Sequence, residues 1–250
     1  MVYAKEIYDY INSFAPFDTA MSFDNVGLLI GDENTASNIV LLALDVTTQV
    51  IEEAVQKGAK IIISHHPIIF NPLKSIPTDS VQYLAVKNEL TIISAHTNLD
   101  IAPGGVNDTL AQAIGIQFTE HTNEDCMLTG ELAEETDSKN FALKIKSVLG
   151  CHGLRYTERN GNIKRVTVAC GAGGDSIFAA AKTGTQAFVT GEIKHHEILF
   201  ANQNNISVFD LGHFRSEDMI ITKLALILSE KFPDTKFEKA DSDTDKVKYI

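Results

Sequence analysis

Imidazole and carboxylate side chains are grouped along this chain in a way that points to metal chemistry. Six of its eight histidines lie in four short segments, each directly after an apolar run. Those segments contain His65 and His66, then His96 with Asp100, then His195 with His196, and last His213 with Glu217. Neutral imidazoles and carboxylates bind zinc, iron and manganese, and the same groups transfer protons in hydrolytic reactions.

The adjacent pair His65 and His66 is suited to two metal ions rather than one. Pro67 biases His66 toward an extended backbone, and successive side chains of an extended chain point in opposing directions. Each imidazole can then bind its own ion, while the carboxylate of Asp100 bridges the two.

His213 and Glu217 are four residues apart, which places them on one face if they belong to a helix. The apolar period predicts a helix over 216–229, and the pair joins it if the first turn starts a few residues early. Each group also has an ordinary interpretation: a hydrogen-bonded or surface histidine, a helical ion pair, or an aspartate that caps a turn.

Strand-like and helical patterns alternate around these groups, which predicts α/β units with mainly parallel strands. In the first half, strands are expected at 38–46, 60–64 and 91–95. A helix capped by Thr47 or Thr48 ends at Gly58, and a second helix lies near 79–89. Functional groups of parallel sheets gather after the carboxyl ends of the strands, which is where the histidines lie.

A second unit of the same kind begins 126 residues later, where 166–190 aligns with 40–64 and 206–210 resembles 91–95. The similarity indicates an internal duplication, and two unrelated units with the same patterning remain the alternative. The segment 116–162 between them has the pattern strand, helix, strand. We therefore expect two interleaved, similar α/β domains, with a first domain of 1–124 plus 206–250 and a second of 125–205.

Composition narrows the class of protein. The formal net charge of −12 disfavours binding to nucleic acid, which depends on clustered lysine and arginine. The three cysteines are widely spaced and odd in number, so neither disulfides nor a cysteine zinc site is indicated, and a reducing cytoplasm is expected. No apolar run approaches the roughly 20 residues needed to cross a bilayer, so a membrane role is not expected.

Six sequence blocks, in this order, resemble the Nif-three-like family, whose bacterial members carry the name GTP cyclohydrolase 1 type 2 homologue. They are "FDNVGLLIG" (23–31), "LALDVT" (42–47), "SHHP" (64–67), "SAHTNLD" (94–100), "TGEIKHHE" (190–197) and "GHFRSE" (212–217). The chain departs from the common pattern at Phe23, where many members have Trp, and at Phe214 and Arg215.

The resemblance implies a dinuclear metal centre with two divalent ions per subunit, zinc, iron or manganese. Its ligands fall on His65, His66, Asp100, His213 and Glu217, at the carboxyl ends of the strands between the two units. The resemblance also implies a toroidal homohexamer with metal sites facing the interior.

These observations lead to two functional hypotheses. The favoured one is a metal-dependent hydrolase in which His96 transfers protons, with a small-molecule substrate that the resemblance makes a purine nucleotide such as GTP. Contacts to substrate are expected from Asn25, Lys194, His195 and Arg215. The alternative is a metal-stabilised, ring-shaped binding or regulatory protein without turnover.

Overall fold

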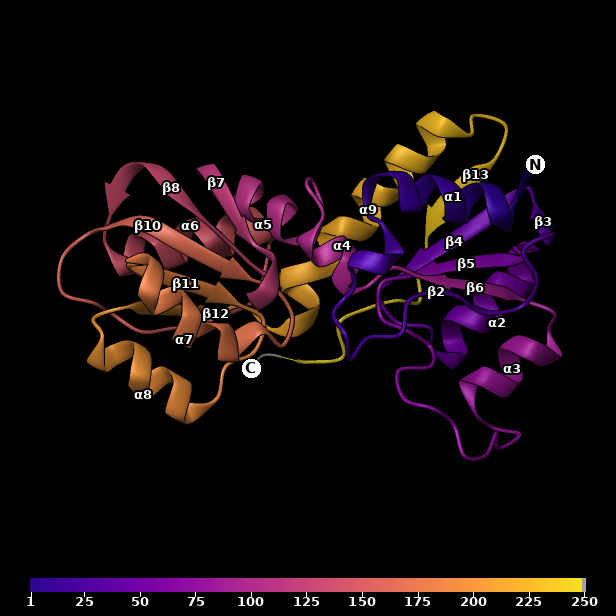
Figure 1. Cartoon of the computed structure of the whole chain (residues 1–250), viewed down its shortest axis with the longest axis horizontal. Coiled ribbons are helices and arrows are strands. Elements are labelled where there is room, and N and C mark those ends of the chain that lie inside the picture. Colours follow the sequence, from indigo (N-terminus) through magenta and orange to yellow (C-terminus); the bar gives the residue numbers. More distant parts are fainter. Residues whose placement is uncertain (249–250) are drawn as a thin grey trace. The chain divides into compact units, whose positions relative to one another are not determined.

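The computed structural model describes residues 1–248, and the chain divides into two compact units. Unit 1 comprises Met1–Ala102 and Ile220–Thr244, and unit 2 comprises Pro103–Met219 together with the segment that begins at Asp245. Each unit contains a sheet with helices packed on it (Figure 1). The predicted α/β class with mainly parallel strands is therefore confirmed.

The sheet of unit 1 has four neighbouring parallel strands and one antiparallel edge strand. In the order of the sheet, its strands are β13 (Lys236–Lys239), β4 (Ile39–Ala43), β5 (Ile61–Ser64), β6 (Thr91–Ser94) and β2 (Gly27–Ile30). β13, β4, β5 and β6 are parallel, and β2 pairs with β6 in the antiparallel direction. Two short strands, β1 (Val2–Tyr3) and β3 (Ala36–Ser37), form a separate antiparallel pair.

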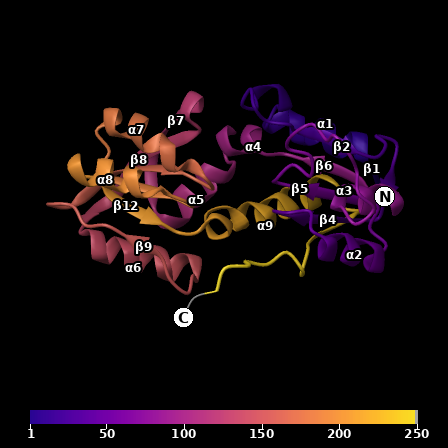
Figure 2. The same ribbon diagram turned by 90° about the horizontal axis from the view of Figure 1, so that it is seen from below.

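Helices cover both faces of this sheet. They are α1 (Ala4–Phe14), α2 (Thr48–Lys57), α3 (Val81–Lys87) and α4 (Thr97–Ile101), with a 3₁₀ turn η1 at Phe17–Thr19. α2 and α3 lie on the face opposite α1 (Figures 1 and 2). The Thr47 side chain caps α2 by accepting a hydrogen bond from Val50 N, and Gly58 ends it in the left-handed conformation. Both ends of α2 agree with the prediction.

Unit 2 contains a larger mixed sheet. Its strands, in order, are β7 (Ile116–Thr122), β8 (Met127–Thr136), β10 (Ile163–Ala169), β11 (Ala187–Thr190), β12 (Ser207–Asp210) and β9 (Arg155–Tyr156). β10, β11 and β12 are parallel, whereas β7, β8 and β9 pair in the antiparallel direction.

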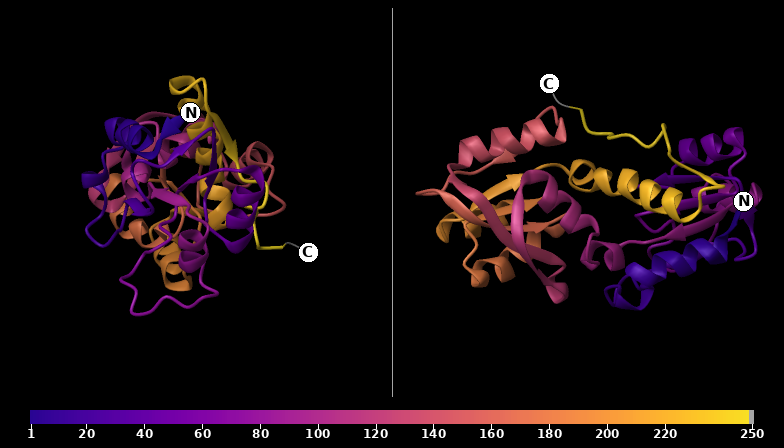
Figure 3. Two further views of the ribbon diagram at one scale, coloured as in Figure 1. Left: turned by 90° about the vertical axis from the view of Figure 1, so that its right-hand side faces the viewer. Right: turned by 90° about the horizontal axis from the view of Figure 1, so that it is seen from above.

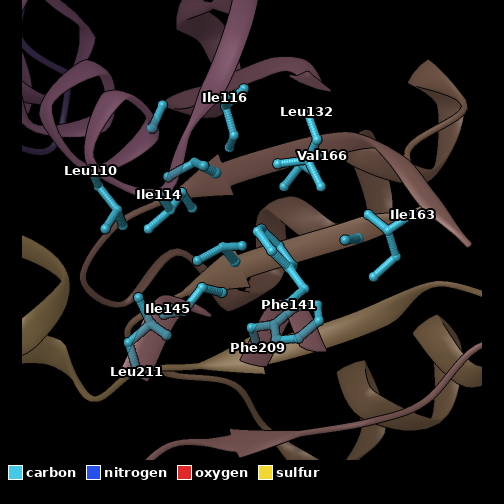
Figure 4. Packing of buried hydrophobic residues seen from close by; sticks show 14 of the residues in the cluster. Leu110, Ile114, Ile116, Leu132, Phe141, Ile145, Ile163, Val166, Phe209 and Leu211 are labelled. Carbon is cyan, nitrogen blue, oxygen red and sulfur yellow. The ribbon is translucent and has the colours of Figure 1, made fainter. Parts of the chain in front are cut away.

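The helices of unit 2 enclose two apolar layers, one on each face of its sheet. They are α5 (Val106–Ile114), α6 (Ser138–Leu149), α7 (Ile177–Ala180) and α8 (His195–Gln203), with 3₁₀ turns η2 (Asn123–Asp125), η3 (Gly173–Ser176) and η4 (Ala181–Thr183). Phe141 and Ile145 of α6 pack with Leu110 of α5 and Phe209 of β12 on one face (Figure 4). α7 and α8 lie on the other face (Figure 3, right).

Helix α9 (His213–Lys231) contains the division between the units, since its residues up to Met219 belong to unit 2 and those from Ile220 to unit 1. It begins three residues before the predicted start at 216. His213 and Glu217 therefore share its first turns, as the spacing of the pair requires.

The strand registers of the two units match the repeat in the sequence. Val40 of β4 pairs with Ile61 of β5, and 126 residues later Val166 of β10 pairs with Ala187 of β11. Both pairs of strands are parallel, and both have the same register. This agreement supports the interpretation that the two units arose by duplication.

The unit boundaries differ from the predicted ones, because 103–124, 206–219 and the segment that begins at Asp245 belong to unit 2. α5 packs in the unit 2 core and β7 pairs with β8, while β12 completes the parallel part of the unit 2 sheet. The last two residues of the predicted first domain, 249–250, lie outside the described residues. Within residues 1–248, no helix has the length and apolar character needed to cross a membrane.

The largely buried carboxylate of Glu53 connects α2 to the segment after β13. Glu53 accepts hydrogen bonds from Lys57 Nζ at 2.7 Å, from Asp241 N at 3.0 Å, and from Ser242 N and Oγ at 2.9 and 2.6 Å. Burial alone raises the pKa of this carboxyl, but the hydrogen bonds outweigh it and lower the pKa from 4.5 to about 2.

We expect Glu53→Gln to lower the free energy of unfolding at pH 7 by about 1–2 kcal/mol, since charge-assisted hydrogen bonds are lost. Because the folded pKa is depressed, this contribution is fully present above pH 4.5 and declines as the pH falls toward about 2. Denaturant unfolding at several pH values measures it. The exposed neighbour Glu52, changed to Gln, is the matched control and should have little effect. A wild-type-like Glu53→Gln protein at pH 7 would contradict the assignment.

Candidate metal-binding residues

The pair His65 and His66 continues the line of strand β5. His65 N donates to Ala43 O at 3.1 Å and His66 N donates to Leu44 O at 2.9 Å, so the ladder with the β4 segment extends beyond Ser64. Ser64 Oγ donates to His66 O at 2.8 Å and fixes the turn of the chain. The two imidazoles thus stand on a backbone that the sheet holds in place.

Both imidazoles have their Nδ1 atoms bound to oxygen. His65 Nδ1 lies 2.8 Å from Ala95 O, and His66 Nδ1 lies 2.9 Å from a carboxylate oxygen of Asp45. A carbonyl oxygen only accepts, so the proton of neutral His65 is on Nδ1 and its Nε2 carries a lone pair. The same assignment follows for His66. This arrangement is the usual support of a metal-binding histidine.

His96 is held in the same way by a buried carboxylate. Its Nδ1 lies 2.9 Å from Asp24 Oδ1, and the side chain of Asp24 has no exposed surface. Asp24 Oδ2 accepts hydrogen bonds from Thr97 N at 3.0 Å and Thr97 Oγ1 at 2.6 Å. Burial raises the pKa of the Asp24 carboxyl, yet the hydrogen bonds from His96 and Thr97 outweigh it and lower the pKa from 3.8 to about 2. Asp24 is therefore an anionic anchor for His96.

The three imidazoles of unit 1 form one cluster. Their ring centroids are 5.0 Å apart for His65 and His66, 5.1 Å for His65 and His96, and 5.6 Å for His66 and His96. One nitrogen from each lies within 4.8 Å of the others. Asp100, on the short helix α4, places Oδ1 3.4 Å from His65 Nε2. Four predicted residues are thus brought together in unit 1.

In unit 2 the predicted pair His213 and Glu217 is in contact at the start of α9. His213 Nε2 lies 3.2 Å from Glu217 Oε2, and the Glu217 side chain is only 4% exposed. His213 Nδ1 lies 2.9 Å from Glu192 Oε1, in the loop after β11. A fourth imidazole therefore has an oxygen at Nδ1, and its Nε2 is directed toward a buried carboxylate.

Gly171 allows the main chain after β10 to pass directly over this pair. Its φ is +59°, and a Cβ built there would overlap Glu217 Oε1 and lie 3.2 Å from His213 Nε2. Gly171 N donates to Ser216 Oγ at 2.9 Å, and Ser216 Oγ donates to His213 O at 2.7 Å. A residue with a side chain at 171 would displace the carboxylate of Glu217.

The residues predicted to contact substrate have structural partners. Asn25 Nδ2 donates to Ile69 O at 2.5 Å, and Arg215 Nε lies 3.5 Å from Asp245 Oδ2. Lys194 N, at the start of α8, donates to Glu197 Oε2 at 2.7 Å. His195 and His196 are exposed on α8, in agreement with the helix-surface alternative.

Two partners of the histidines, Asp24 and Asp45, were not identified as functional from the sequence. Asp24 lies 72 positions from His96, and Asp45 lies 21 positions from His66. Both occur in the recognised blocks, "FDNVG" and "LALDVT", which was the only available signal. Local sequence spacing does not reveal partners that are this far apart along the chain.

The donor chemistry of these residues fits divalent transition metals. Neutral imidazole Nε2 atoms and carboxylate oxygens are ligands that zinc, iron and manganese all accept. Nδ1 is bound to oxygen in four of the histidines, His65, His66, His96 and His213. The structure therefore contains groups able to bind a divalent metal.

Comparison with known proteins gives the family. The profile of Duf34/NIF3 (NGG1p interacting factor 3) matches residues 2–246, which is nearly the entire chain. The chain belongs to the Duf34/NIF3 family. The resemblance found in the six sequence blocks is thereby confirmed.

Relatives within the Duf34/NIF3 family cover almost the full length. A protein of Clostridium perfringens named GTP cyclohydrolase 1 type 2 homolog is 34% identical, over 96% of this chain and 94% of its own. GTP cyclohydrolase 1 type 2 of Helicobacter pylori is 33% identical, over 92% and 91%. The crystal structure of a Bacillus cereus protein related to NIF3 superimposes with a TM-score of 0.91 at 26% identity, covering 100% of this chain and 99% of that one.

We expect Gly171→Ala to disturb Glu217 and lower the affinity for divalent metal about 10- to 100-fold, since the added methyl group occupies the position of its carboxylate. Gly150→Ala is a matched control, because Gly150 has nearly the same φ, +57°, with open space around its Cβ position. Both variants carry a similar backbone strain, of about 1–2 kcal/mol. Equilibrium dialysis with zinc or manganese measures the difference. Equal metal affinity in the two variants would refute the role given to Gly171.

Proposed function

We propose that this chain is a metal-dependent hydrolase with two divalent ions per subunit. The proposed ligands are His65, His66, Asp100, His213 and Glu217. Zinc, iron and manganese are the candidate metals, because all three accept a mixed set of imidazole and carboxylate donors.

The observation that carries this proposal is the shared orientation of the histidines. Each Nδ1 is bound to a carbonyl or carboxylate oxygen at 2.8 or 2.9 Å, which fixes the direction of each Nε2. In His65, His66 and His213 the Nε2 atom is the proposed metal ligand, and in His96 it is the proposed proton-transfer atom. Metal-binding histidines usually donate their other ring N–H to a carboxylate, a backbone carbonyl or water, and these four rings have that arrangement. The buried carboxylates of Asp100 and Glu217 lie against two of these Nε2 atoms.

Bound divalent ions supply Lewis acidity, which lowers the pKa of water toward neutrality and polarises the group under attack. Within the chain, His96 is the proposed proton-transfer residue. Asp24 fixes its Nδ1 proton and its ring orientation, leaving Nε2 to accept or give a proton. The low pKa of Asp24 keeps this anchor ionised throughout the physiological range. Asp24 is thus a positioning residue, and His96 is the proposed catalytic residue.

The proposed substrate is a purine nucleotide such as GTP, opened hydrolytically at its imidazole ring. Support comes from the names of the relatives, including GTP cyclohydrolase 1 type 2 of Helicobacter pylori at 33% identity. We further propose, from the resemblance alone, that the subunits form a toroidal homohexamer in the cytoplasm.

The test is to load the purified protein with manganese, zinc or iron and to follow GTP by ultraviolet absorbance and mass spectrometry. We expect ring-opened product from the wild type and at least a 100-fold lower rate from His96→Gln, with its metal content retained. Asp100→Asn should lose both metal and turnover. His152→Gln, at an exposed histidine outside the four segments, is the control and should keep both.

Two outcomes would change the proposal. Turnover of phosphoesters without any ring-opened product would remove the cyclohydrolase assignment and keep the hydrolase. If the wild type turns over nothing under every metal, while Asp100→Ala loses its oligomeric assembly, the metals are structural and the regulatory alternative is correct.

A further inference from the structure

Two phenylalanines of unit 1 are exposed beside the histidine cluster. Phe23 is 61% exposed and Phe70 is 43% exposed, and an exposed pair of neighbouring aromatic rings is more informative than a single exposed apolar residue. Their ring centroids are 6.3 Å apart, and the Phe70 centroid is 6.2 Å from that of His96. An aromatic surface therefore adjoins the proposed proton-transfer residue.

The loops that carry these rings are held by hydrogen bonds at the neighbouring residues. Asp24, next to Phe23, is buried and binds Thr97 and His96. Asn25 connects the same loop to the other one by donating to Ile69 O, next to Phe70, at 2.5 Å. The side chains of Asp24 and Asn25 are thus used internally while the adjacent ring of Phe23 stays exposed. Hydrogen bonds at the neighbouring residues therefore hold the main chain beside both exposed rings.

The neighbouring rings meet at an angle rather than in a parallel stack. Phe23 and Phe70 are tilted by 50° to each other, and Phe70 meets His96 at 79°, so the faces of the rings are not stacked on one another. Aromatic faces of this kind bind nucleobases by stacking, which tolerates any base because each has a π-face. Because the Phe70 centroid is 6.2 Å from that of His96, a base stacked on Phe70 is expected to lie near the proposed proton-transfer residue.

We propose that Phe23 and Phe70 form a stacking surface that binds the heteroaromatic ring of the substrate. This inference rests on the proposed function, because the bound heterocycle is taken to be the base of the substrate that reacts beside His96. It assigns the recognition of the heterocycle to two exposed rings, and it predicts that a sugar phosphate without a base is bound poorly.

The chain offers a direct probe, because it contains no tryptophan. In Phe23→Trp the indole is the single tryptophan fluorophore, and an aromatic residue is kept at the proposed surface. We expect guanosine and GTP to quench its emission in a saturable manner, whereas ribose 5-phosphate does not. The titration is done on the full chain after chelation of metal, so that no turnover occurs and binding is measured separately from catalysis.

The second variant, Phe70→Leu in the Phe23→Trp background, removes the neighbouring ring and should weaken the Kd for guanosine about tenfold. Phe118→Leu in the same background is the control, since Phe118 is 84% exposed on β7 of unit 2. It should leave the Kd unchanged. Circular dichroism confirms that each variant is folded.

Two results would overturn the proposal. One is the absence of saturable quenching by guanosine, or an equal Kd with and without the Phe70 ring. The other is a loss of oligomeric state, by sedimentation, in Phe23→Leu and Phe70→Leu with no change in guanosine binding by equilibrium dialysis, which would make the rings an interface with a second copy. Binding is measured without metal, so it is tested separately from turnover. A protein that binds guanosine but opens no purine ring under any metal would refute the cyclohydrolase assignment and support the stacking surface.

Discussion

The hydrogen bond from imidazole Nδ1 to an oxygen acceptor is the interaction on which the candidate metal-binding residues depend. It fixes the tautomer and the rotation of each ring together, because an imidazole with its proton on Nδ1 presents a lone pair only at Nε2. In this chain the acceptors are one carbonyl, of Ala95, and three carboxylates, of Asp24, Asp45 and Glu192. The direction of each Nε2 follows from these four oxygens.

The parallel sheets explain why the residues occur where they do. Strands that run in one direction end at one edge, and the turns that follow them lie together there. His65 follows β5, and the loop with His96 follows β6, so neighbouring strands deliver them as neighbours. In unit 2 the turn after β10 and the start of α9 approach so closely that residue 171 has no space for a side chain.

Much of this organisation could be predicted from local patterns. Apolar runs located β4, β5 and β6, Thr47 and Gly58 gave the ends of α2, and the four-residue spacing placed Glu217 beside His213. The long-range contacts could not be predicted in this way. Asp24 reaches His96 across 72 positions, and no periodicity encodes such a pair. The unit boundaries differed because a helix followed by a strand, as in 103–124, fits either sheet until its packing is known.

One of the four oxygen atoms that accept from the imidazoles cannot be removed by mutation. The acceptor for His65 is the main-chain carbonyl of Ala95, which every amino acid at that position would supply. The carboxylates of Asp24, Asp45 and Glu192 vanish with a single codon change. A single substitution can therefore change the orientation of His66, His96 or His213. The orientation of His65 depends on a main-chain oxygen and is retained whatever residue occupies position 95.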